Sequence, residues 1–196
     1  MTVPVSTDIA TAREANINAW ADAIGAGNAD EWRKCFSPGA TIREDAFGDQ
    51  TVEAGELRDY AATVFESIKI DRPTFQTIIH DDERTAVWWR MTGTAAKPWP
   101  GVFDTITPGA KFTFDGVSIF EFDENYRYAS QNVFWDLRSL ARQVSPEANA
   151  LELMQELRHL HLKHLDTSGR FVEDARGSFA KIDELHSQLL VRETAG

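Results

Sequence analysis

The chain has 196 residues, of which 42% are hydrophobic and 26% are charged, and this composition is typical of a globular protein with a real core. The formal net charge is −11, and no stripe of Lys and Arg interrupts the acidic field, so we expect neither nucleic acid nor a membrane as a partner. The single cysteine, Cys35, excludes an internal disulfide. Together with the absence of a signal-peptide pattern and of an apolar span, it favours a cytoplasmic location.

The first seventy residues predict mainly helices. Ile17, Trp20 and Ile24 recur at helical spacing, and the sequence Ser37-Pro38-Gly39 is typical of a turn. We predict helices over Ser6–Gly25, Asn28–Phe36 and Val52–Lys69, with a short strand over Ala40–Phe47.

After Pro73 the sequence becomes rich in β-branched and aromatic residues, which favours strands. We predict four strands, over Thr74–His80, Thr85–Ala95, Lys111–Phe122 and Tyr126–Trp135. From Asp136 onward the pattern is again helical, with an interruption at Ser145-Pro146. The sequence therefore predicts an α+β domain over residues 1–144 and a helical C-terminal extension over residues 145–196.

Three stretches carry a resemblance to a known group of proteins: "ATIREDAFGDQTVEAGELRDYAA", "VWWRMTGT" and "FTFDGVSIFEFDENYRYASQNVFWDLRSLARQ". In this order they resemble the nuclear-transport-factor-2-like superfamily, with its SnoaL-like polyketide cyclases and ketosteroid-isomerase-like members, over roughly residues 8 to 143. The resemblance implies a cone-shaped roll in which N-terminal helices cover a strongly curved antiparallel sheet around an apolar pocket. It also implies a homodimer formed through the outer face of the sheet.

Two aspartates are the catalytic candidates. The resemblance to ketosteroid isomerases places their general base at Asp45, but the match needs an extra residue in "REDAF", so Glu44 is the alternative. Asp136 follows the last strand and resembles the acid/base aspartate of SnoaL-like cyclases. It also precedes a helical run, where an aspartate is well placed as an N-cap.

The substrate-binding candidates are aromatic residues and hydrogen-bond donors. Trp20 and Ser118 align with the two oxyanion-hole positions of the isomerases, although neither is the family's residue type. Arg90 would bind a carboxylate or enolate if its strand face lines the pocket, and otherwise would pair with Glu121 or Asp115. The full set is Trp20, Tyr60, Trp88, Arg90, Phe114, Ser118, Phe120 and Trp135.

These features favour an enzyme that performs cofactor-free acid/base chemistry on a hydrophobic, polyketide-like carbonyl compound: cyclisation, isomerisation or dehydration. An epoxide hydrolase-like enzyme and a non-catalytic binding or assembly module remain alternatives. We expect no cofactor and no metal, because His159, His161 and His164 lack a metal-binding signature. An open cavity with one of the two aspartates inside would favour the enzyme, and a closed, aromatic-filled cone with both aspartates outside would favour the binding module.

Overall fold

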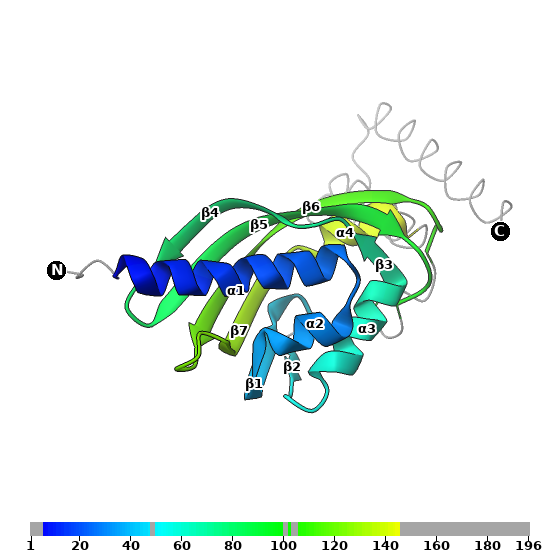
Figure 1. The fold of residues 1–196 in the computed structure, drawn as a ribbon. Coiled ribbons are helices and arrows are strands. Elements are labelled where there is room, and N and C mark those ends of the chain that lie inside the picture. The colour runs from blue at the N-terminus through cyan, green and yellow to red at the C-terminus, as the bar shows by residue number, and fades with distance from the viewer. Residues whose placement is uncertain (1–5, 48–49, 100–101, 103–105, 146–196) are drawn as a thin grey trace, which may run out of the picture. The chain divides into compact units, whose positions relative to one another are not determined.

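One strongly curled sheet of seven strands forms the body of the protein (Figure 1). The computed structural model describes residues 6–47, 50–99, 102 and 106–145. The strand order is β2-β1-β7-β6-β5-β3, and β4 also pairs with β5. All pairs are antiparallel except β1 with β7, which is parallel. The strands are β1 Phe36–Glu44, β2 Gln50–Val52, β3 Ile68–Ile70, β4 Thr74–His80, β5 Arg84–Ala95, β6 Lys111–Phe122 and β7 Tyr128–Trp135.

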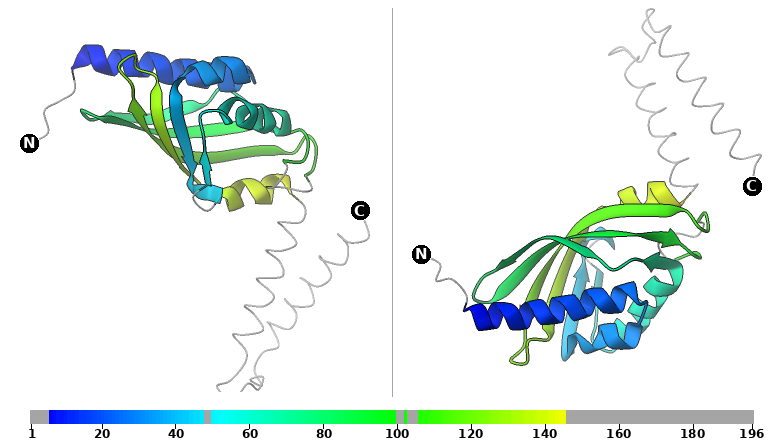
Figure 2. Two further views of the ribbon diagram at one scale, coloured as in Figure 1. Left: turned by 90° about the horizontal axis from the view of Figure 1, so that it is seen from below. Right: turned by 45° about the horizontal axis from the view of Figure 1, so that its top comes forward.

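Three helices cover the concave side of the sheet (Figure 2). They are α1 (Thr7–Gly25), α2 (Ala29–Lys34) and α3 (Leu57–Ser67). The Asn28 side chain caps α2 by accepting hydrogen bonds from the backbone N–H groups of the next turn, as Asn does readily at this position. The helices bury their apolar faces against the sheet, as Ile17 and Trp20 of α1 do.

Strand alternation decides which side chains enter the interior. On β5, Val87, Trp89 and Met91 are buried, whereas Trp88 and Arg90 between them are exposed. Cross-strand neighbours lie on the same face, so the buried residues of β6 face those of β5. The concave face is therefore apolar and aromatic, and the convex face carries the residues of opposite parity.

The helix α4 (Leu137–Val144) lies on the side of the sheet opposite α1 (Figure 2). Its Gln143 side chain accepts a hydrogen bond from the backbone N–H of Thr113 and donates one to the Thr113 carbonyl, at 2.8 and 2.9 Å. The pairing of β6 with β7 ends at Gly116, which lies opposite Trp135, so Thr113 has no partner on β7. The Gln143 amide thus continues the pairing of β6 beyond the end of β7.

The α+β fold with a curled sheet and N-terminal helices confirms the prediction, and several element boundaries differ from it, most of all those of β1 and α3. The strand β1 begins at Phe36, because Pro38 and Gly39 lie in an irregular stretch of its pairing with β7 rather than in a turn. The predicted helix over Val52–Lys69 is shorter, because its two ends pair as β2 and β3.

The chain divides after Val144 into two units, Met1–Val144 and Ser145–Gly196. The predicted C-terminal helices and the three histidines beyond Ser145 lie outside the described residues. In the part that is described, no helix is long and apolar enough to cross a membrane.

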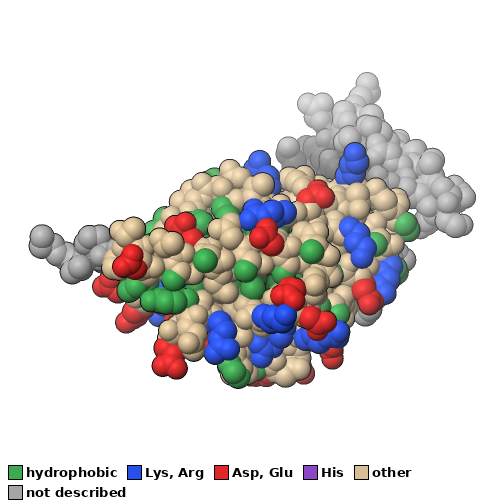
Figure 3. Space-filling view, in the orientation of Figure 1, with side chains coloured by type: hydrophobic (Ala, Val, Ile, Leu, Met, Phe, Trp, Pro, Cys, Tyr) green, Lys and Arg blue, Asp and Glu red, His purple; other side chains and the backbone are tan. Residues whose placement is uncertain are grey.

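Acidic and basic side chains are interspersed over the face of the molecule drawn in Figure 3. Exposed ion pairs such as Arg58–Asp30 and Lys34–Glu31 join side chains of opposite sign. The opposite charges of these pairs cancel locally.

Candidate active site

A cavity lies between the helices and the concave face of the sheet, with a volume of about 80 Å³. This is smaller than the roughly 150 Å³ apolar cavity that accommodates benzene in another protein. Its wall is mostly aromatic and aliphatic, with a few polar groups. It is lined by Trp20, Ile24, Trp32, Ile42, Glu44, Tyr60, Ala61, Val64, Phe65, Ile68, Ile70, Trp89, Met91, Trp99, Phe114, Ser118, Gln131, Val133 and Trp135.

Glu44, at the end of β1, is the carboxylate in the cavity wall, and only 6% of its surface is exposed. One of its oxygens accepts a hydrogen bond from the Tyr60 hydroxyl at 2.8 Å, and the other accepts one from Trp135 Nε1 at 3.0 Å. Burial raises the pKa of the Glu44 carboxyl above its ordinary value of 4.5, and the bonds from Trp135 and Tyr60 offset part of this rise. Glu44 is thus a fixed and more basic carboxylate than one in water.

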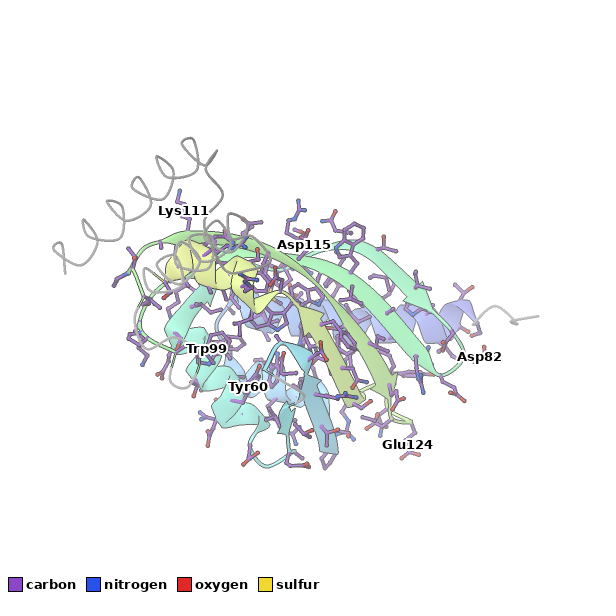
Figure 4. All side chains as sticks on the ribbon, turned by 180° about the vertical axis from the view of Figure 1, so that it is seen from behind. Tyr60, Asp82, Trp99, Lys111, Asp115 and Glu124 are labelled. Carbon is purple, nitrogen blue, oxygen red and sulfur yellow. The ribbon has the colours of Figure 1, made fainter. Side chains whose placement is uncertain are left out.

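Tyr60 extends from α3 toward the interior, and Figure 4 shows it on the same side of the sheet as Trp99. Burial, followed by the neighbouring Glu44 carboxylate, raises the pKa of the Tyr60 hydroxyl well above its ordinary value. Tyr60 is therefore a neutral hydrogen-bond donor to Glu44 at physiological pH.

Ser118, fully buried on β6, is the centre of a polar cluster. Its oxygen accepts hydrogen bonds from Trp89 Nε1 at 2.9 Å and from Gln131 Nε2 at 3.0 Å. A hydroxyl oxygen has two acceptor sites and one donor hydrogen. Because both acceptor sites are used, Ser118 has its O–H left to donate to a group in the cavity.

The strand register places Glu44 and Ser118 on one row of the concave face. Glu44 is the partner of Val133 on β7, and Val133 is the partner of Ser118 on β6. Strands lie about 4.8 Å apart, so the two backbones are roughly 10 Å from each other. Both side chains point into the cavity between the strands and the helices, so a small group can lie between the carboxylate and the hydroxyl.

Five of the eight predicted substrate-binding residues line the cavity: Trp20, Tyr60, Phe114, Ser118 and Trp135. The other three do not. Trp88 and Arg90 lie on the outer face, because their strand parity is opposite to that of Trp89. Arg90 instead pairs with Asp115, with contacts of 2.7 and 2.9 Å, and Asp115 lies across the sheet from Tyr60 (Figure 4). Phe120 is fully buried but does not line the cavity, and its ring stacks on that of Tyr128.

Neither predicted catalytic aspartate lines the cavity. Asp45 is exposed in the 3-10 helix Asp45–Phe47 that follows β1. Asp136 is also exposed, and its carboxylate accepts a hydrogen bond from the backbone N–H of Arg138 at 2.9 Å, as a helix N-cap does. The alternatives considered for these two positions, Glu44 in the pocket and a capping role for Asp136, match the observed geometry.

Sequence reasoning did not identify Gln131 or Trp89 as site residues. Both lie on the wall of the cavity and both donate to Ser118. The sequence signal that could have identified them is the alternation of inward and outward side chains along each strand. Residues two apart, such as Gln131 and Val133 on β7, share a face, and a polar residue on an otherwise apolar face is a site candidate.

With this geometry established, the sequence can be compared with known proteins. Residues 17–130 match the family of SnoaL-like domains, and this stretch is more than half of the chain. The chain belongs to the SnoaL-like domain family. No curated protein is significantly similar to it in sequence.

Solved structures of similar shape support the SnoaL-like fold. A protein from Jannaschia sp. CCS1, proposed to be a SnoaL-like polyketide cyclase, has a TM-score of 0.61 at 20% identity, over 74% of this chain and 99% of its own. A protein from Catenulispora acidiphila with a ketosteroid isomerase-like fold, in complex with trimethylamine, has a TM-score of 0.54 at 16% identity, over 74% of this chain and 98% of its own.

A third similar structure is SalBIII, an epoxide hydrolase/cyclase-like enzyme with a role in pyran ring formation in the polyether salinomycin. Its TM-score is 0.54 at 18% identity, over 66% of this chain and 95% of its own. At these identities the similarity shows the shared fold, and the chemistry has to be argued from the residues in the cavity.

Proposed function

We propose that this SnoaL-like protein is an enzyme that moves a proton next to the carbonyl group of a hydrophobic compound, with Glu44 as the acid/base group. The observation that carries the proposal is a buried carboxylate in the wall of an apolar cavity, held by two donors. A base works best when its pKa is near the working pH. Burial raises the pKa of Glu44 in that direction.

In the proposed reaction, the Glu44 carboxylate takes a proton from the carbon beside the carbonyl. The electron pair of that C–H bond moves into an enolate, and the enolate oxygen accepts a hydrogen bond from the Ser118 hydroxyl. In a cyclisation, the enolate carbon then attacks a second carbonyl, and protonated Glu44 returns its proton to the alkoxide that forms. In an isomerisation, the enolate is conjugated with a C=C bond, and Glu44 returns the proton to the far carbon of that system. Tyr60 and Trp135 are positioning residues, because they act through Glu44.

The size of the cavity bears on the substrate. About 80 Å³ is well below the 300 to 1,000 Å³ of pockets that enclose drug-sized ligands. A polyketide-like substrate would therefore place one end in the cavity, with its carbonyl between Glu44 and Ser118. The similarity to proteins proposed to be polyketide cyclases agrees with such a substrate.

The proposal can be tested without knowing the substrate. A panel of small cyclic and aromatic ketones is incubated with the protein in D₂O, and exchange of the hydrogens beside the carbonyl is followed by mass spectrometry. We expect wild-type protein to accelerate exchange for at least one ketone. Glu44→Gln should reduce that acceleration roughly 10²- to 10⁴-fold, which is the typical contribution of general acid/base catalysis.

Asp45→Asn and Asp136→Asn are the matched controls, because both remove an exposed carboxylate outside the cavity. Both should retain the wild-type exchange rate. Equal exchange by wild-type and Glu44→Gln would refute the role of Glu44. Ketone binding without exchange in any form of the protein would favour the non-catalytic binding module.

We also propose that the protein forms a homodimer through the outer face of the sheet. Trp88, Val117 and Phe134 are direct neighbours across β5, β6 and β7 and are 47%, 36% and 42% exposed. The next pair of β5 and β6 on the same outer face is Arg90 with Asp115. An apolar row beside a pair of opposite charges can match its own copy about a two-fold axis.

Sedimentation of wild-type protein and of Val117→Lys tests this interface, with Asn125→Lys as a control that adds the same charge at an exposed turn. Wild type and Asn125→Lys should sediment as dimers, and Val117→Lys should shift to the monomer. A monomeric wild-type protein would contradict the proposal.

A further inference from the structure

Two buried polar atoms in the cavity wall have no hydrogen-bond partner among the described residues. They are Nε1 of Trp20, which is a donor, and Oε1 of Gln131, which is an acceptor. Leaving a buried donor or acceptor unpaired is costly, and native proteins pair most such groups with protein, water or ligand. Two unpaired atoms of opposite type in one cavity indicate a ligand group that donates as well as accepts.

Both side chains lie beside the same residue, Phe120. The Trp20 ring meets Phe120 edge-on, with centroids 5.9 Å apart. Phe120 on β6 is the direct partner of Gln131 on β7. Cross-strand partners project from the same face of a sheet, so Trp20 and Gln131 are neighbours over Phe120.

The neighbouring polar cluster sets the orientation of the Gln131 amide. Gln131 donates through Nε2 to Ser118, which also accepts from Trp89. With Nε2 committed to Ser118, Oε1 is left as the acceptor of this side chain. Gln131 thus has two roles: it prepares Ser118 as a donor, and it offers its own oxygen.

We propose that Trp20 and Gln131 form a subsite for a hydroxyl group of the substrate. The hydroxyl oxygen accepts from Trp20 Nε1, and its hydrogen is donated to Gln131 Oε1. This inference rests on the proposed function and narrows its substrate to hydroxylated carbonyl compounds. Glu44, Val133 and Ser118 are cross-strand partners, and Gln131 lies two residues before Val133 on the same face of β7. The subsite is therefore the next position along the strands from Glu44 and Ser118. A hydroxyl a few bonds from the reacting carbonyl spans this distance.

Cyclopentanol and cyclopentanone are suitable probes, because they share a ring and differ in the donor hydrogen. Their affinities for wild-type protein are measured by titration, read on the backbone amide signals of β6 and β7 in ¹H–¹⁵N NMR spectra. We expect cyclopentanol to bind roughly fivefold more tightly, the usual effect of one additional hydrogen bond. Equal affinities, or no saturable binding of the alcohol, would overturn the subsite.

The comparison on wild-type protein needs no variant, and three variants locate the effect. Trp20→Phe should weaken cyclopentanol roughly fivefold, because the hydroxyl oxygen loses its indole donor. Gln131→Met should weaken the alcohol alone and abolish its preference. Tyr128→Phe is the matched control, because it removes another buried hydroxyl without a partner that does not line the cavity. It should leave both affinities unchanged.

Two structural outcomes would also refute the subsite. One is a crystal structure with cyclopentanol in which an ordered water still bridges Trp20 and Gln131. The other is the reverse orientation of the Gln131 amide, which would present two donors and give the alcohol no advantage. Glu44→Gln separates this test from that of the proposed function. If the subsite is correct, this variant keeps the preference for the alcohol whether or not it loses exchange activity.

Discussion

The hydrogen bond from Tyr60 to Glu44 predicts a change in the titration of the carboxyl. Tyr60 donates to one carboxylate oxygen at 2.8 Å, and a hydrogen bond to the charged form of an acid lowers its pKa. Tyr60→Phe removes this donor and leaves the aromatic ring. The pKa of Glu44, already raised by burial, should therefore rise further.

A hydrogen bond to a charged group contributes about 1.5 to 3 kcal/mol. Since each factor of ten corresponds to about 1.4 kcal/mol, the ionised fraction of Glu44 should fall about 10- to 150-fold at a fixed pH below its pKa. Proton abstraction by the carboxylate should fall by the same factor there. The loss should diminish as the pH rises, because the carboxyl of the variant then ionises as well.

The assay is a pH titration of the Glu44 carboxyl carbon by ¹³C NMR in wild-type protein and Tyr60→Phe. Tyr128→Phe is the control, since this buried hydroxyl makes no hydrogen bond to Glu44 and lies outside the cavity wall. The midpoint should move upward in Tyr60→Phe and stay in place in Tyr128→Phe. An unchanged midpoint in Tyr60→Phe would refute the assignment of Tyr60 as the donor that stabilises the carboxylate.

Three further predictions concern stability. The raised pKa of Glu44 means that its protonated form stabilises the fold below about pH 4.5 and that this contribution is lost as the pH rises through the folded-state pKa. Glu44→Gln should therefore gain stability relative to wild type as the pH rises above about 4.5 in urea titrations, and a constant difference would contradict this. Gly116→Ala puts a Cβ 2.2 Å from the Trp89 ring. It should cost about 1–3 kcal/mol and lower the melting temperature, and an unchanged melting temperature would argue against this contact. Arg13, buried on α1, donates to three carbonyls of the turn Asp81–Arg84. Arg13→Met should destabilise the fold by roughly 2–4 kcal/mol, and a loss below about 0.5 kcal/mol in the same titration would contradict this.

The order of elements was predictable because the local signals are strong. The strands over Thr74–His80 and Lys111–Phe122 have the predicted bounds, since runs of β-branched and aromatic residues end at clear turns. The strand β1 was less clear, because Pro38 and Gly39 favour a turn by themselves. Their place in a strand depends on pairing with β7, which lies about ninety residues later. Short segments such as β2 and β3 depend in the same way on distant partners.

The candidate site was predictable only in part, because one residue along a strand changes the face. Glu44 and Asp45 are adjacent acids, and Glu44 points inward because Ala40 and Ile42 before it do. Arg90 had two possible faces, and its partner Asp115 settles that it lies on the outer one. Strand alternation places Gln131 on the same face as Val133, but its hydrogen bond to Ser118 is a tertiary contact that alternation does not reveal.

The pairing of β1 with β7 has a consequence for how the protein is made. Glu44 and its donor Trp135 are 91 positions apart. A growing chain on the ribosome has only the short β2 to pair with β1 until β7 has been synthesised. Such distant contacts are typical of slow folding. The Glu44 carboxyl therefore acquires its buried setting only after nearly the whole of residues 1–144 has been synthesised.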